Sequence, residues 1–355
     1  MDGFFSRFKK DKISLSALIV LVVLYVAILF ATFISPYDKN YSDRSLSYSP
    51  PSNIYTITPE GKLSKPYTYN WKRKFNTHTL NVEFREDRSQ KYYLNFFSEG
   101  FEYKLFGIFK TNIHLFGIEN GGKLNLLGCD INGRDNFSRL LYGGRISLTI
   151  GFLALLISFP IGLLYGGISG YFGGKTDIVL MRISEAIMSI PTFYLLIILA
   201  AILPSDMTSA QRFALITVIL AFIGWAGFAR VVRGMVLSIK NEEYVKAAKS
   251  LGASNLRIIT KHILPQTSSY VIIAIALSVP GFILAESGLS FLGLGIQQPD
   301  ASWGNMLKEA QEFANIMYRP WLLTPGFLIF IAVLSYNVIG DTIRDILDPK
   351  SKIRT

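Results

Sequence analysis

The sequence contains few residues that bind metals or catalyse reactions, and this excludes several classes of site. Its 355 residues include one cysteine, Cys129, and three histidines, His78, His114 and His262. A single cysteine cannot form an intramolecular disulfide or a cysteine-rich metal site, and the histidines are too far apart in sequence to form a ligand cluster. There is no Gly-x-Ser-x-Gly motif, no histidine pair and no pair of carboxylates within an apolar run. We therefore expect no metal, no catalytic residue and no enzymatic activity.

Charged residues are also scarce for a chain of this length. They make up 17% of the sequence, whereas hydrophobic residues make up 50%, and the mean hydropathy is +0.34. These values are typical of a membrane protein rather than of several soluble domains. The net charge is +11, but many basic residues stand beside apolar runs. Contact with an anionic bilayer surface explains that pattern, and we expect no nucleic-acid partner.

Long apolar runs dominate the rest of the sequence, and each is close to or above the ~20 residues that cross a bilayer as a helix. They predict an all-α polytopic membrane protein with six transmembrane helices. The first run has no small-residue cleavage site and is longer than the core of a signal peptide, so we interpret it as a retained span. The six runs are Ile13–Ser35, Ile146–Tyr171, Val179–Leu203, Phe213–Val236, Ser268–Leu289 and Trp321–Ile339.

Basic residues indicate the orientation of these spans. With six spans, the two termini and the segments after spans two and four lie on one side, and these are the segments rich in lysine and arginine. We therefore expect the N- and C-termini to be cytoplasmic. The basic residues concerned are Arg7, Lys9, Lys10, Lys12, Lys175, Arg182, Arg230, Arg233, Lys240, Lys246, Lys249, Arg257, Lys261, Arg344, Lys350, Lys352 and Arg354.

Residues 38–140 differ from the rest because they are polar, charged and rich in aromatic residues. Stretches of alternating polarity predict a small β-rich extracytoplasmic insert. Within it, Asn120-Gly121-Gly122 predicts a hairpin between Leu115–Ile118 and Lys123–Leu127. The insert either contacts a binding protein or stabilises the outer face. The predicted domains are residues 1–37, residues 38–140, a transmembrane domain 141–341 and a tail 342–355.

Small and acidic residues stand out within and beside the apolar runs. Gly162, Gly166 and Gly170 form a stripe with a spacing of four, which lets helices approach closely, either within this chain or between subunits. Glu286 is an intramembrane carboxylate that either forms packing hydrogen bonds or lines a transport pathway. Gly-Gly-Lys-Thr at 173–176 resembles part of a phosphate-binding loop, but Ser169 occupies the place of the first glycine, so we interpret it as a tight turn.

The segment Glu242–Gln266 lies between two predicted spans but is amphipathic rather than apolar. Gly252 is a natural helix terminator, so the pattern predicts one helix before it and a second helix over Ser254–His262, with Pro265 opening the next span. Such a helix–glycine–helix unit is either a rigid knob that docks in a partner's groove or a connector lying on anionic lipid. Composition alone leaves both alternatives open.

This segment resembles the coupling loop of type I ABC importer permeases. The family pattern is Glu-Ala-Ala, three residues, Gly, and a hydrophobic-Leu-Pro about a dozen residues later, although here Lys246 replaces the glutamate. The resemblance implies a fold like that of methionine-importer permeases and an ATPase-coupling role for this loop. The residues concerned are Glu243, Tyr244, Ala247, Ala248, Gly252, Ile263, Leu264 and Pro265.

Other stretches are similar to the C subunit of the dipeptide and oligopeptide branch. The resemblance implies a bacterial cell-membrane importer for peptides with a second, B-type permease subunit, two ABC ATPases that use ATP and Mg²⁺, and an extracytoplasmic substrate-binding protein. It implies no cofactor on this chain. Relatives importing oligosaccharides or nickel complexes, and less closely a secondary transporter, are the alternatives. The similar stretches include 133–135, 138–140, 144–148, 170–174, 285–295, 303–304 and 340–349, whereas the long insert and Cys129, in place of threonine, depart from the family.

Overall fold

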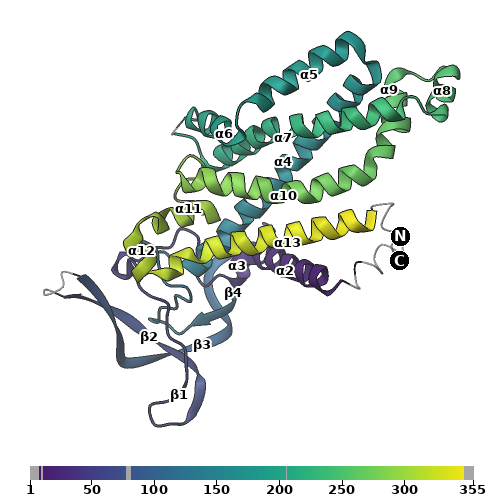
Figure 1. The fold of residues 1–355 in the computed structure, drawn as a ribbon. Coiled ribbons are helices and arrows are strands. Elements are labelled where there is room, and N and C mark those ends of the chain that lie inside the picture. The colour runs from purple at the N-terminus through teal and green to yellow at the C-terminus, as the bar shows by residue number, and fades with distance from the viewer. Residues whose placement is uncertain (1–7, 9–10, 77–80, 205, 348–355) are drawn as a thin grey trace. The chain divides into compact units, whose positions relative to one another are not determined.

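The structure is a computed structural model that describes residue 8 and residues 11–76, 81–204 and 206–347. The chain divides into two compact units, shown together in Figure 1. Unit 1 comprises Met1–Val22, Leu148–Leu289 and Ile329–Thr355, and unit 2 comprises Val23–Ser147 and Ser290–Leu328. Several residues named above lie outside the described residues: Arg7, Lys9, Lys10, His78, Lys350, Lys352 and Arg354.

Helices account for most of the described chain, and four strands lie between the first two long helices. The α-helices are α2 (Lys12–Leu29), α3 (Ala31–Ile34), α4 (Asn136–Phe172), α5 (Gly174–Ser189), α6 (Thr192–Ala201), α7 (Ser209–Ile239), α8 (Glu243–Ser250), α9 (Asn255–Arg257), α10 (Ser268–Phe291), α11 (Trp303–Leu307), α12 (Phe313–Tyr318) and α13 (Thr324–Leu347). The strands are β1 (Tyr55–Ile57), β2 (Leu63–Asn76), β3 (Asn81–Leu105) and β4 (Phe109–Ile118).

Five helical stretches of the described chain are long and apolar enough to cross a membrane, and a bent helix pair raises the number to six. The stretches are Lys12–Leu29, Asn136–Phe172, Ser209–Ile239, Asn255–Phe291 and Pro320–Leu347. The bent pair is α5 and α6, whose axes differ by 81°. The break follows from Pro191, which has no N–H to donate and holds Ile190 in an extended conformation. The predicted fold class, a helical membrane protein with a small β-rich insert, is confirmed.

Hydrogen bonds within unit 1 show that the bent pair crosses rather than re-enters. Lys240, which follows α7, donates to the carbonyl of Gly170 at the end of α4 (2.8 Å), and Tyr171 donates to Asn255 (2.9 Å). The ends of α4 and α7 therefore lie on the same side. Since α7 crosses once between them, the α5–α6 pair must also cross once. The third predicted span, Val179–Leu203, is thus a broken helix.

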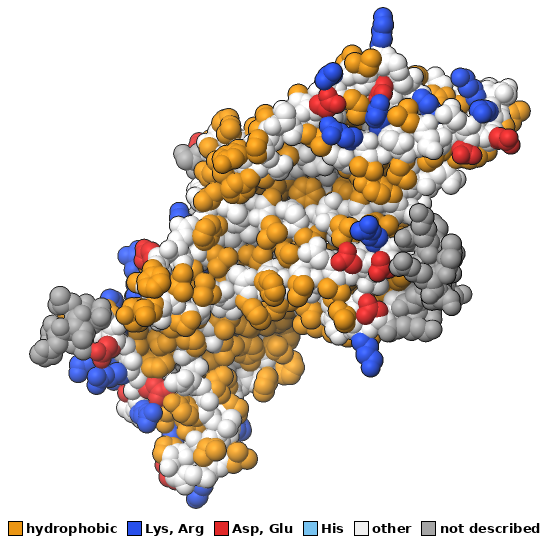
Figure 2. All heavy atoms as spheres, viewed as in Figure 1, with side chains coloured by type: hydrophobic (Ala, Val, Ile, Leu, Met, Phe, Trp, Pro, Cys, Tyr) orange, Lys and Arg blue, Asp and Glu red, His pale blue; other side chains and the backbone are white. Residues whose placement is uncertain are grey.

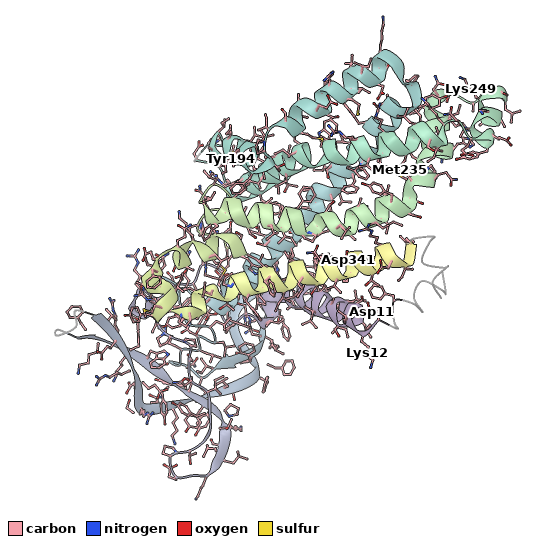
Figure 3. The ribbon with its side chains drawn as sticks, viewed as in Figure 1. Asp11, Lys12, Tyr194, Met235, Lys249 and Asp341 are labelled. Carbon is pink, nitrogen blue, oxygen red and sulfur yellow. The ribbon has the colours of Figure 1, made fainter. Side chains whose placement is uncertain are left out.

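The start of α2 and the end of α13 also lie together in unit 1. Thr342 donates to the carboxylate of Asp11 (3.3 Å), and Ser14 hydrogen-bonds to both residues. Figure 3 labels Asp11 and Asp341 at these helix ends. An even number of spans returns the chain to its starting side, so this contact agrees with six crossings.

The glycine stripe of α4 packs against α7. A Cβ atom at Gly166 would lie 2.4 Å from the carbonyl oxygen of Ala229, and one at Gly170 would lie 2.8 Å from the carbonyl of Arg233. One at Gly162 would lie 2.7 Å from the Phe228 ring. Only glycine permits this approach between backbones. The contact lies within the chain, as the intra-subunit alternative expects.

An ion pair reinforces the same helix group near the start of α5. Arg233 donates to both carboxylate oxygens of Asp177 (2.6 and 2.5 Å), and Ser169 donates to the same carboxylate (2.6 Å). Gly173 and Gly174, with φ of 64° and 54°, form the turn that connects α4 to α5. The Gly-Gly-Lys-Thr sequence therefore builds a tight turn between helices, as expected.

Unit 2 contains one antiparallel sheet with strand order β1-β2-β3-β4. Tyr67 and Tyr69 are buried, and Tyr55 lies against both with ring centroids 5.6 and 5.7 Å away. The hydroxyl of Tyr67 donates to the carbonyl of Ile57 (2.9 Å) and joins β1 to β2. Aromatic residues therefore form the small core of the insert.

The predicted hairpin at Asn120-Gly121-Gly122 is wrong. The chain turns there, but Lys123–Leu127 form no strand. The side chain of Asn70 on β2 accepts from the backbone of Lys123 (2.7 Å) and donates to Gly121 (2.8 Å), so it fixes the departing chain in place of a strand ladder. The β3–β4 hairpin instead turns at Phe106-Gly107-Ile108, where Asn-Gly is absent and Gly107 supplies a φ of 75°.

The family-like stretches at the start of α4 contribute to a buried charged cluster in unit 2. Asp130 accepts from Arg134 (2.6 Å) and lies 3.5 Å from Arg139, and both arginines donate to Gln298. Glu309 accepts from the backbone of Ile131 (3.0 Å). These contacts fix the segment between α10 and α13 against the start of α4.

Further hydrogen bonds hold the start of α4 in this arrangement. Asp135 accepts from the backbone and hydroxyl of Ser138 (2.7 Å each) and so caps the first turn of α4. Trp303 is fully buried, donates from its indole to the carbonyl of Leu140 (2.9 Å), and donates from its backbone N–H to the hydroxyl of Ser147 (3.0 Å). The family-like residues of this region therefore hold these segments together within unit 2.

Candidate functional site

The segment between α7 and α10 begins with the short helix α8, which Gly252 terminates. The N–H of Ala253 donates to the carbonyl of Ala248 (3.1 Å), and the N–H of Gly252 donates to that of Lys249 (3.0 Å). These two bonds define a Schellman motif, which requires a left-handed residue after the helix. Gly252 supplies it with a φ of 82°. The helix therefore ends at Gly252, as the sequence predicts.

The predicted site residues of α8 lie on two different faces of the helix. Val245 and Ala248 are buried, whereas Glu243, Tyr244 and Ala247 are exposed. The two alanines of the motif therefore point in different directions: Ala248 packs inward, and Ala247 faces outward. Of the two alanines, only Ala247 faces solvent.

Leu251 was not predicted as a site residue, yet its side chain is 88% exposed. It lies four positions after Ala247 and seven after Tyr244, a spacing that places all three on one side of a helix. Tyr244 is 43% exposed. We call Tyr244, Ala247 and Leu251 the apolar stripe. The i, i+3, i+7 spacing was the signal in the sequence that could have identified Leu251.

The second half of the loop is anchored on α4. Ile258, Ile259 and Ile263 are fully or almost fully buried. A Cβ atom at Gly167 of α4 would lie 3.1 Å from Ile259 and 3.3 Å from Leu264, so the loop packs closely on that helix. Leu264 therefore packs on α4 and does not belong to the exposed face of the loop.

Pro265 does not open a new helix, contrary to the expectation from sequence. The helical stretch runs from Asn255 to Phe291 without a break. A π-helical segment, Ile258–Ile263, and a 3₁₀ segment, Leu264–Thr267, lie around the proline. These altered turns accommodate the missing N–H of proline. The anchor of the loop and span five therefore form one continuous helical element.

Charges surround the apolar stripe. Glu243 lies at the start of α8 and Lys249 at its end, where each complements the helix dipole. Burial, together with nearby Glu242, raises the pKa of Tyr244. In the described part of the chain, neither Lys246 nor Lys249 has an ion-pair partner. Figure 2 shows charged side chains gathered around α5 and α8, and Figure 3 labels Lys249 on the outer side of α8.

Glu286, the other predicted functional residue, is fully buried in α10, with Ser287 donating to its carboxylate (3.5 Å). A cavity of about 290 Å³ lies nearby in unit 1, between α4, α6, α7 and α10, and Glu286 is not among its lining residues. The pathway role of Glu286 stays a prediction. The lining is mostly apolar and comes from Phe159, Thr192, Leu196, Leu220, Ile223, Gly224, Ser278, Gly281, Phe282 and Ala285.

Residues 158–353 match the sequence family described as the binding-protein-dependent transport system inner membrane component. This match covers more than half of the chain, including the loop and its anchor. The chain belongs to this family. It is therefore a multi-pass inner-membrane permease subunit of an ABC transporter, which is a transport component and not a catalytic subunit. Residues 2–51 also match the family described as the N-terminal TM domain of oligopeptide transport permease C.

One relative extends the match to almost the whole chain. The chain is 32% identical over 347 residues to the dipeptide transport system permease protein DppC of Lactococcus lactis subsp. cremoris (strain MG1363), covering 97% of this chain and 89% of that protein. It is 46% identical to the DppC protein of Bacillus subtilis (strain 168), covering 63% of this chain and 68% of that one.

A further relative and one solved structure complete the comparison. The chain is 44% identical to the oligopeptide transport system permease protein OppC of Haemophilus influenzae (strain ATCC 51907), covering 64% of this chain and 71% of that protein. A structure of the MetNI methionine ABC transporter in an inward-facing conformation aligns with a TM-score of 0.40 and 17% identity, covering 57% of this chain and 92% of that one.

Proposed function

We propose that this permease subunit forms half of the transmembrane pathway of a peptide importer and that α8 transmits the movement of a separate ATPase to it. The peptide class is supported by the names of the relatives, which are dipeptide and oligopeptide permeases. The partners are a B-type permease subunit, two ABC ATPases and an extracytoplasmic binding protein. ATP and Mg²⁺ bind to the ATPases, and this chain binds no cofactor.

The exposed apolar stripe is the observation that carries the coupling role. Tyr244, Ala247 and Leu251 face away from the chain on a helix with a fixed end, and removing such apolar surface from water favours association. The small side chain of Ala247 leaves room for a groove wall to approach. The nearby positive charges of Lys246 and Lys249 complement acidic residues on the partner.

Mechanical continuity supports the same role. Force applied to α8 passes through the short Gly252 connection into the helical stretch that begins at Asn255, and this stretch continues as span five. Ile259 and Leu264 of the stretch pack against Gly167 of α4, so a second span receives the displacement. A flexible loop would dissipate this movement.

The proposed orientation places α8 and both termini in the cytoplasm. The support is the concentration of lysine and arginine on this side, including Lys240, Lys246 and Lys249. The contact between Asp11 and Thr342 agrees with an even number of spans. The sheet of unit 2 then lies outside the cytoplasm.

An ATPase co-purification experiment tests the coupling role. The change is Ala247→Arg in the complete transporter, and the expected result is at least a tenfold loss of ATPase recovered with the permease, because a long charged side chain blocks the groove. The matched control is Ala314→Arg, which makes the same change on exposed α12 at the other side of the membrane. Equal ATPase recovery with both variants would contradict the proposal.

Transport assays test the substrate class separately. Vesicles containing the complete transporter should accumulate labelled di- or oligopeptide only when ATP and the binding protein are present. Uptake by the isolated chain without ATP would indicate a secondary transporter instead. Normal ATPase assembly without peptide uptake would overturn the substrate class and leave the coupling role standing.

A further inference from the structure

The tip of the β3–β4 hairpin exposes an unusual amount of apolar surface. Residues 104–110 read Lys-Leu-Phe-Gly-Ile-Phe-Lys. The side chains of Phe106, Ile108 and Phe109 are 51%, 73% and 65% exposed. We call Lys104–Lys110 the hairpin tip. Three large hydrophobic side chains exposed to water are unfavourable at a turn, where polar residues are normal.

Within unit 2, the hairpin tip lies against the outer end of the first span. The rings of Phe106 and Phe30 meet edge to face with centroids 5.3 Å apart, and those of Phe97 and Phe33 are 6.3 Å apart. Figure 1 accordingly places β4 beside α3, which follows α2 directly. The hairpin is therefore located by contacts with the residues that directly follow the first span, α2.

The depth of Phe30 in the bilayer follows from the length of α2. The helix has 18 residues, which corresponds to about 27 Å at 1.5 Å per residue. The hydrocarbon core of a bilayer is roughly 30 Å thick. Phe30 comes directly after α2, so it lies near the outer edge of the hydrocarbon, and Phe106 lies at the same level.

The apolar surface of the tip continues that of α2. Val23, Val26 and Leu29 are exposed on α2, as expected for side chains that face lipid. The exposed side chains of the tip lie next to the same end of this helix. An exposed apolar surface thus extends from the span onto the β-hairpin.

The charges at the tip complete the argument. Lys104 and Lys110 are directly opposite each other across the two strands, an arrangement that destabilises a hairpin in water. In the described part of the chain, neither lysine has an ion-pair partner. Lipid phosphates remove this repulsion, because lysine side chains extend from an apolar segment to the headgroups. Aromatic residues flanked by lysines are typical of a membrane interface.

We propose that the hairpin tip inserts into the outer-leaflet interface of the bilayer, with Phe106, Ile108 and Phe109 among the acyl chains and Lys104 and Lys110 at the phosphates. The sheet is then held to the membrane at two places, by its connection to α2 and by this tip. The insertion gives the insert a fixed orientation above the transporter. It is independent of the peptide class and of the ATPase contact.

Spin-label accessibility in lipid nanodiscs tests the insertion in the complete transporter. The variants are Ile108→Cys and Phe109→Cys, with Leu63→Cys as the matched control, because Leu63 is an 87% exposed apolar residue near the β1–β2 turn. Cys129 is buried, so the parent chain should show little labelling. Oxygen concentrates in lipid, whereas a nickel chelate stays in water.

We expect collisions with oxygen to exceed collisions with the chelate severalfold at positions 108 and 109, and the reverse at position 63. Ile108→Asp in the Phe109→Cys background should bring position 109 towards the value at position 63. Chelate accessibility at 108 and 109 equal to that at 63 would overturn the proposal. Protection from both reagents would also overturn it, because it would show that a protein partner covers the tip.

Discussion

The packing of α4 on α7 gives a prediction whose size follows from single distances. In Gly166→Ala, the new Cβ would lie 2.4 Å from the carbonyl oxygen of Ala229 and 2.9 Å from the Cβ of Val232. A backbone carbonyl cannot rotate away as a side chain can, so the helices must separate. Overpacking of this kind costs typically about 1–3 kcal/mol, while replacing a helical glycine by alanine returns about 0.5–1 kcal/mol. We expect a net loss of about 1–2 kcal/mol.

The matched control lies on the partner helix. A Cβ atom added at Gly234 of α7 would have no atom within 4 Å among the described residues, so Gly234→Ala should be neutral or slightly stabilising. The destabilisation by Gly170→Ala and Gly162→Ala should lie between those of Gly166→Ala and Gly234→Ala. Gly162→Ala should be the milder of the two, because the nearest neighbour of its new Cβ is the side-chain ring of Phe228. The expected order of destabilisation is thus Gly166, Gly170, Gly162, Gly234.

The assay is unfolding of the isolated chain in mixed detergent micelles with increasing sodium dodecyl sulfate, followed by circular dichroism. The isolated chain is the appropriate sample because it contains no subunit interface. Equal midpoints for Gly166→Ala and Gly234→Ala would refute the packing argument. A loss of stability seen only in the assembled transporter would assign the glycine stripe to a contact between subunits.

Three further outcomes follow from other contacts. Gly252→Ala should weaken the end of α8 by about 1–2 kcal/mol, because alanine is strained at a φ of 82°, and Gly252→Asn should cost less; exchange of the backbone amide hydrogens at positions 252 and 253 measures this. Arg233→Met should cost about 1–3 kcal/mol in detergent unfolding, because it leaves the Asp177 carboxylate without its charged partner and with only the Ser169 hydroxyl, and adding Asp177→Asn should recover part of the loss. Burial, together with the carboxylate of Asp130, raises the pKa of Glu309 to about 7, so the folded chain binds a proton more tightly than the unfolded chain. Its contribution to stability is therefore fully present below about pH 4.5 and is lost as the pH rises through about 7, and Glu309→Gln should flatten that decline in unfolding measured from about pH 5 to 8.

The loop between α7 and α10 shows which features residue patterns and spacing can predict and which they cannot. Gly252 as a helix end could be predicted, because the conformation after a helix depends on the local chain. The different directions of Ala247 and Ala248 could not, because they depend on where α8 contacts the rest of unit 1. The role predicted for Pro265 was wrong for the same reason: packing on α4 stabilises π and 3₁₀ turns that local rules disfavour.

The insert shows the same division. Aromatic and alternating residues predicted strands, but the Asn-Gly-Gly sequence predicted the wrong hairpin. The side chain of Asn70, about fifty residues earlier, fixes the chain there instead. No window of local sequence contains that interaction.

The sequence by itself determined the membrane class, the apolar runs and the family-like loop with its glycine end. These properties depend on composition and on short-range spacing, which hydropathy and helix geometry interpret directly. Only the tertiary structure decided that the glycine stripe meets α7, that Glu286 is buried, that the third apolar run is a bent pair crossing once, and that the hairpin tip lies beside α2. These depend on which surfaces meet across long sequence separations, and that choice is made by packing.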